Sequence, residues 1–126
     1  MKIIRKMEAV NVFKPEGTNI FYYLFNEYVL NYIEQIPNSV QSWHHHEKIW
    51  ETLYVIEGVL IMRWKEGETL KEDIIKAGDL IETERTPHTL INNTNNLAKF
   101  IVIKQILKGE NFSELLKTDK IVHHQK

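Results

Sequence analysis

The chain has 126 residues, enough for one domain with its own hydrophobic core, and it contains no cysteine. Disulfide frameworks and thiolate metal sites are therefore excluded, and histidine and carboxylate side chains remain as the good metal ligands. The formal net charge is -1, from 16 basic and 17 acidic side chains that are intermixed along the sequence. Because no broad field of one sign exists, we expect neither nucleic acid nor a membrane as a partner.

The beginning of the chain gives no sign of an export signal. Residues 1–6 carry three basic side chains and no apolar run long enough for a signal peptide, and no later stretch is long enough to span a membrane. We therefore expect a cytoplasmic location. No repeat or shift of composition marks a boundary, so we expect a single domain over residues 1–126.

Strand-forming residues occur in short runs throughout the chain, and turn formers such as Pro15-Glu16-Gly17, Gly58 and Ala77-Gly78-Asp79 separate them. Many short strands at close spacing are typical of an all-β barrel or sandwich. The expected strands cover residues 7–13, 20–25, 28–36, 40–46, 52–57, 59–64, 70–75, 80–84, 88–91 and 99–107.

The C-terminal part of the chain has three features. Residues 100–103 are apolar at every position, which predicts a strand covered on both faces; either a second subunit or the N-terminal strand could be the outer cover, and we expect a homodimer. Asn111, with Glu114 three residues later, predicts one short helix over residues 111–117. We expect the charged tail that ends in His123-His124-Gln125-Lys126 to be frayed.

Three adjacent histidines, His44-His45-His46, are the first chemically informative stretch. Successive side chains of a strand point to opposite faces, so His44 and His46 can enter one cavity while His45 points away. Glu51 follows five residues after His46, and His88 is a fourth candidate ligand much later in the chain. The alternative is a solvated histidine tract that attracts metal only weakly.

The spacing around this tract is informative. From His44 the pattern runs His-x-His, four residues, Glu51, six residues, Gly58; the second part runs from Gly78 to His88, ten residues later, and to Asn92. Over roughly residues 37–92 it resembles the two signature motifs of the cupin family, in which the first motif supplies two His and a Glu and the second a third His.

Two departures from the family pattern stand out. Asn38 occupies the place of the usual Gly six residues before the first His, and Asn also tolerates a left-handed backbone. Glu84-Arg85-Thr86-Pro87 replaces the usual Pro-x-Gly turn, and the interval from Gly78 to His88 is one residue shorter than common. We therefore expect a different loop over the cavity.

The resemblance implies a double-stranded β-helix, or jelly-roll barrel, that holds a divalent metal on His44, His46, Glu51 and His88. Imidazole and carboxylate suit iron, manganese, nickel or zinc, and open positions would remain for water or substrate. The metal's identity does not follow from the sequence.

Other polar residues near the motifs are not expected to bind the metal. Glu47 and His45 are expected on the outer surface, and Asn92 is expected to fix a turn. Arg85, in the loop before His88, could orient a carboxylate or phosphate of a substrate, although an exposed loop arginine is more often merely solvated.

Two kinds of function fit these residues. The first is a metal-dependent enzyme, dioxygenase-like or isomerase-like, that acts on a small polar metabolite. Candidate general bases are limited to Glu82, Glu84 and Tyr54, which slightly favours oxygenase-like chemistry. The second is a non-catalytic domain that binds or senses a sugar or another small molecule, because a fold does not determine a function.

Overall fold

The computed structural model describes residues 1–106 and 120–123, and nearly all of its regular structure is β. A single 3₁₀ turn, η1 (Lys6–Glu8), precedes the strands of this described part. The strands are β1 (Val10–Lys14), β2 (Thr18–Leu24), β3 (Tyr28–Gln35), β4 (Ser39–Val40), β5 (Trp43–His46), β6 (Ile49–Glu57), β7 (Val59–Glu66), β8 (Thr69–Lys76), β9 (Leu80–Glu82), β10 (His88–Asn92), β11 (Ala98–Ile106) and β12 (Lys120–His123).

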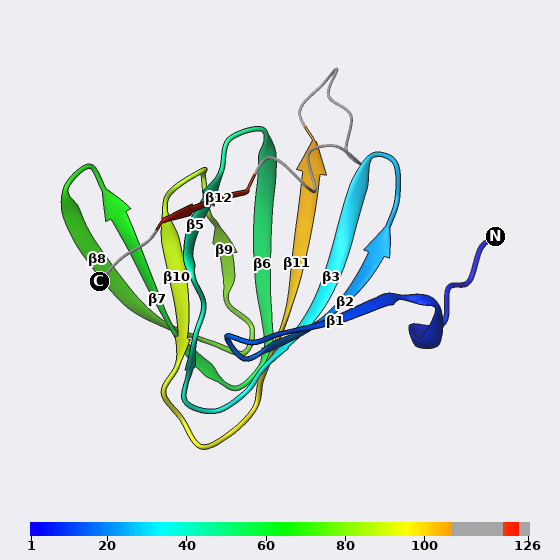
Figure 1. Cartoon of the computed structure of the whole chain (residues 1–126), viewed down its shortest axis with the longest axis horizontal. Coiled ribbons are helices and arrows are strands. Elements are labelled where there is room, and N and C mark those ends of the chain that lie inside the picture. Colours follow the sequence, from blue (N-terminus) through cyan, green and yellow to red (C-terminus); the bar gives the residue numbers. More distant parts are fainter. Residues whose placement is uncertain (107–119, 124–126) are drawn as a thin grey trace.

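These strands form two antiparallel sheets (Figure 1). The first sheet has the order β1-β2-β3-β11-β6-β9, and the second has the order β12-β5-β10-β7-β8, with β4 also paired to β10. Strands that are distant in the sequence are neighbours in both sheets, as in a jelly roll. The all-β jelly-roll architecture predicted from the sequence is confirmed.

The hydrophobic core lies between the two sheets and follows the two-residue period of the strands. In β11, Ala98, Phe100 and Val102 are buried, whereas the residues between them are only partly covered. The same alternation in the facing strands completes one cluster of buried apolar side chains: Ile20, Ile33, Leu53, Val55, Leu60, Met62, Ile75, Leu90, Ala98, Phe100 and Val102.

The outer face of β11 is half-buried. Ile101 lies between Tyr32 of β3 and Tyr54 of β6 in the register of the first sheet. The N-terminal strand does not cover this face, because β1 extends the sheet at its edge beside β2. Lys6 of η1 reaches over the rings of Phe21 and Tyr32. The expected homodimer stays a prediction.

Several expected boundaries were wrong. Residues 7 and 8 belong to η1 instead of a strand, and the single strand expected over 40–46 is divided into β4 and β5. β6 begins at Ile49, three residues earlier than expected. In the tail that was expected to fray, residues 120–123 form β12, which pairs with β5, and residues 124–126 lie outside the described residues. The helix expected over 111–117 lies outside the described residues.

Two tight turns explain residues of the motif pattern. Gly58 alone connects β6 to β7, with φ at 90°, and a Cβ there would lie 2.9 Å from Ala98 Cα and 3.0 Å from Leu97 O. These atoms are backbone and cannot move aside, so glycine is required. Asn38 has φ at 56°, which confirms the left-handed backbone expected at this position.

None of the helices in the described ranges is long and apolar enough to cross a membrane.

Replacing Phe100 with Ala should destabilise the fold by about 3–5 kcal/mol, because it removes a fully buried ring from the centre of the core. Ile74→Ala is the matched control, since Ile74 is 64% exposed, and it should change stability by no more than about 0.5 kcal/mol. Urea denaturation followed by circular dichroism measures both. Similar losses for the two variants would place the core elsewhere.

Candidate metal centre

Three strands bring the four predicted ligands to one place inside the barrel. His44 and His46 alternate on β5, Glu51 lies on β6 and His88 lies on β10, directly opposite His44. All four side chains are buried, with exposures of 6% for His44, 4% for His46, 5% for Glu51 and 3% for His88. Glu51 belongs to the same inward-facing series of β6 as Ile49, Leu53 and Val55. The two-residue period of the strand alone therefore explains why the Glu51 side chain points into the barrel.

The distances between their polar atoms suit a divalent ion. His46 Nε2 lies 3.3 Å from Glu51 Oε2, and His88 Nε2 lies 3.2 Å from Glu51 Oε1. Ligand atoms of His44, His46 and Glu51 all lie within 4.8 Å of one another. Atoms held at about 2.1 Å from one metal in tetrahedral or octahedral geometry are about 3.0–3.4 Å from their nearest fellow ligands. The donor set therefore fits a divalent metal.

Backbone carbonyls fix two of the rings in the form that a metal needs. His44 Nδ1 lies 2.8 Å from Ser42 O, and His88 Nδ1 lies 2.7 Å from Thr86 O. A carbonyl can only accept, so each Nδ1 carries the proton and donates it. In the neutral ring Nε2 then has a lone pair directed at the cluster, which is the usual arrangement of a metal-ligating histidine.

Second contacts hold those carbonyls in place. Glu16 Oε2 accepts hydrogen bonds from the Ser42 backbone N–H and hydroxyl, both at 2.9 Å. On the other side, the Thr83 N–H and hydroxyl donate to Glu51 O, both at 3.2 Å, and Thr86 N–H donates to Thr83 O at 2.8 Å. The turn before His88 is thereby attached to the strand that carries Glu51.

Electrostatics keep the carboxyl ionised and the imidazole neutral. Burial by itself would raise the pKa of Glu51, but its contacts with His46 and His88 and the positive charge of Lys104 hold it well below its usual value. Burial lowers the pKa of His44 well below its usual value, and His88 and Lys120 lower it further while Glu51 opposes them. A carboxylate and a neutral imidazole are the protonation states that bind metals.

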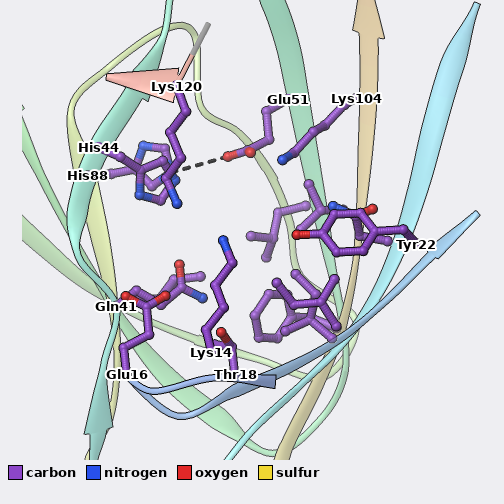
Figure 2. A pocket seen from close by; sticks show the side chains of 17 residues that line it. Lys14, Glu16, Thr18, Tyr22, Gln41, His44, Glu51, His88, Lys104 and Lys120 are labelled. Atoms are coloured by element: carbon purple, nitrogen blue, oxygen red, sulfur yellow. Dashed lines mark ion pairs between the residues drawn. The ribbon is translucent and has the colours of Figure 1, made fainter. Parts of the chain in front are cut away.

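A cavity adjoins the cluster and contains cations that sequence reasoning missed. Its lining includes His44, Glu51 and His88 together with Lys14, Lys104 and Lys120 (Figure 2). Lys104 lies directly opposite Glu51 in the register of β6 and β11, and Lys120 lies directly opposite His46 in that of β5 and β12. The sequence could have indicated Lys104, because this residue continues the two-residue series of inward positions that includes Phe100 and Val102.

A second cavity of about 270 Å³ also includes His88 in its lining. Glu82 and Glu84, two of the predicted bases, are exposed side chains on its lining, whereas Tyr54 is 44% exposed and lines neither cavity. Arg85 is also absent from both linings; its guanidinium lies 5.7 Å from the centre of the Trp50 ring. Its role in binding substrate stays a prediction.

The residues assigned to the outside and to turns are where they were expected. His45 lies on the opposite face of β5, with Nδ1 2.6 Å from His123 Nε2 of β12, and Glu47 is an exposed neighbour of His45. Asn92 is fully buried, and its amide donates to Gln35 O and Asn96 O at 3.0 and 2.9 Å. Asn92 therefore fixes a turn.

Comparison with protein-family models gives one match, the cupin domain, over residues 31–104. No curated protein matches the chain in sequence.

Solved structures share the fold at low sequence identity. A predicted oxalate decarboxylase from Thermotoga maritima is 19% identical with a TM-score of 0.72, over 84% of this chain and 100% of that one. A cupin-superfamily sugar phosphate isomerase from Silicibacter pomeroyi is 18% identical with a TM-score of 0.63, over 79% and 70%. Fe(II) HppE is 19% identical with a TM-score of 0.67, over 82% and 60%.

Burial and the positive charges of Lys14 and Lys104 lower the pKa of Lys120 to about 8 from an ordinary value of 10.5. Carbon-detected NMR of the lysine Cε should therefore show one lysine that titrates near this value, and Lys120→Met should remove that signal while Lys76→Met, on exposed β8, should keep it.

The shift also predicts how stability depends on pH. Between about pH 8 and pH 10 the unfolded chain binds more protons at this position than the folded chain, so the free energy of unfolding contributed by Lys120 rises with pH. Urea denaturation across this range should show a smaller rise for Lys120→Met than for Lys76→Met. If every lysine titrated above about pH 10, then Lys14, Lys104 and Lys120 would not lie as close together as the structure places them.

Proposed function

Because the chain belongs to the cupin family, we propose that it holds a divalent transition metal on His44, His46, Glu51 and His88 and is a metal-dependent enzyme for a small polar molecule. The observation that carries this proposal is the convergence of three imidazoles and one carboxylate, all buried, beside a cavity. Iron, manganese, nickel and zinc all accept such ligands.

The position of the site supports catalysis over a purely structural metal. Structural sites are closed by protein ligands, whereas this cluster borders a cavity in which further ligands can approach. When bound, such a metal polarises a carbonyl or carboxylate oxygen of a substrate, or engages in redox chemistry if it is iron. The residues of the chain orient the ligands, exclude most water and supply charge.

The choice between dioxygenase-like and isomerase-like chemistry depends on proton transfer. Isomerisation needs a group that takes and returns a proton, and Lys120, with a pKa of about 8, is suited to that near neutral pH. The sequence alone slightly favoured oxygenase-like chemistry because it offered few general bases. The position and pKa of Lys120 strengthen the case for isomerase-like chemistry. The names of the structural neighbours include both an iron protein and a sugar phosphate isomerase, so both chemistries stay within the proposal.

His88→Ala should weaken binding of Zn²⁺ or Mn²⁺ by more than about 100-fold, because losing even an outer partner of a ligand costs about 10–100-fold. Metal content after dialysis and a metal titration measure this, and circular dichroism shows whether the variant is folded. His45→Ala is the matched control, since His45 is a histidine of the neighbouring strand β5 that faces away from the cluster, and it should keep full metal content. Full metal content in His88→Ala would contradict the ligand assignment.

Turnover is tested separately from metal binding. The purified protein should either consume oxygen with at least one member of a panel of small hydroxy and oxo acids when it is loaded with Fe²⁺, or isomerise a sugar phosphate or a keto acid when it is loaded with Mn²⁺ or Zn²⁺. Glu51→Gln should abolish either activity, because it removes the anionic ligand. Stoichiometric metal with neither oxygen uptake nor isomerisation across both panels would favour a binding or sensing domain.

A further inference from the structure

The cavity beside the four-residue cluster is lined by an excess of positive charge. Lys14 of β1, Lys104 of β11 and Lys120 of β12 come from three strands that are distant in sequence, and their ammonium groups point into the middle of the same pocket (Figure 2). Two of these strands belong to the first sheet and one to the second. The fold therefore brings together three like charges that repel one another.

The carboxylates in the lining are already engaged. Glu16 accepts both hydrogen bonds from Ser42, and Glu51 contacts His46 and His88. Among the described residues of the lining, three ammonium groups face two carboxylates, which leaves one net positive charge. A divalent metal at the cluster would raise this excess to three. A half-buried excess of this kind favours an anionic occupant.

The size of the cavity limits the occupant. The space open to the centre of a water-sized molecule is about 40 Å³, and one water needs roughly 10–15 Å³ of such space. A ligand with a few heavy atoms can therefore enter. The wall between the cations and the core is apolar, with Leu53, Leu90 and Val102 on it, which suits a short carbon chain.

We infer that this cavity binds a compact oxyanion, a short carboxylic acid or a phosphate, on the ammonium groups of Lys14 and Lys120. The inference rests on the proposed function only in placing a second oxygen of the ligand at the metal. The ammonium contacts themselves require no metal. They favour small acids as the substrate class, and uncharged molecules of the same shape bind more weakly.

Isothermal titration of metal-free protein, prepared with a chelating resin, tests the inference with malonate, inorganic phosphate and the uncharged isostere malonamide. Malonate or phosphate should bind at one site, and malonamide should bind at least about tenfold more weakly than malonate, the loss expected when one charge-assisted contact is removed. The tighter of the two anions identifies the group that the lysines accept. Added NaCl should weaken binding of the anions.

Lys14→Met and Lys120→Met should each weaken anion binding at least about tenfold, because methionine keeps most of the length and loses the charge. Lys76→Met, on exposed β8, is the matched control and should leave the affinity unchanged. If Lys120→Met fails to fold, the affinity of Lys14→Met and the comparison of malonate with malonamide still test whether the cavity binds anions. Repeating the titration on Zn²⁺-loaded protein should tighten malonate binding.

The outcomes separate this inference from the metal proposal. Anion binding that depends on Lys14 in a protein that takes up no metal would support the inference and overturn the proposed function. Stoichiometric metal with anion affinity that is unchanged in both lysine variants, or with equal binding of malonate and malonamide, would overturn the inference alone. Failure of both anions to bind the metal-free and the Zn²⁺-loaded protein would also overturn it.

Discussion

The buried charge of Glu51 is the constraint that organises the interior of this barrel. An isolated carboxylate removed from water costs several kcal/mol, so it persists only with close partners. Here the partners come from other strands, namely His46 from β5, His88 from β10 and Lys104 from β11. The backbone oxygen of the same residue also holds Thr83. Loss of this one charge would leave cations and imidazoles of both sheets without their common partner.

The sequence predicted the ligands well because their geometry is local. The two-residue period of a strand places His44 and His46 on one face and His45 on the other, whatever the exact ends of the strand. Glu51, five residues after His46, and the distant His88 were candidates by residue type, and the resemblance implied that all four converge on one metal. The expected start of the next strand was late, yet this did not matter, because Glu51 shares the inward phase of Leu53 and Val55.

The features that the sequence did not predict depend on pairing between distant segments. β12 is only four residues long, with Ile121 and Val122 as its strand-forming residues, and its register with β5 is what places Lys120 opposite His46. The apolar run of β11 predicts a strand, but hydrophobicity alone does not identify Lys104 as an inward residue of that strand. A charged residue at an inward-facing position of an otherwise apolar strand indicates a cavity better than hydrophobicity does.

The altered turn before His88 shows how a site can be kept when its loop changes. Glu84 and Arg85 both have a left-handed backbone, with φ at 51° and 61°, which costs a non-glycine residue roughly 1–3 kcal/mol. The bonds from Thr83 to Glu51 O offset part of that cost, and the turn directs Thr86 O at His88 Nδ1. The shorter interval therefore still places the ring correctly.

The lysines beside the cluster present an electrostatic conflict that an anion would resolve. Lys104 favours the ionised form of Glu51, which promotes metal binding, but Lys104 and Lys120 would also repel a divalent ion in the same cavity. An anion between the lysines and the metal is attracted by both. By thermodynamic linkage, each would then increase the affinity for the other, so that the site is completed by its substrate. In the proposed site, the lysines that repel a metal on its own would favour a metal accompanied by an acid.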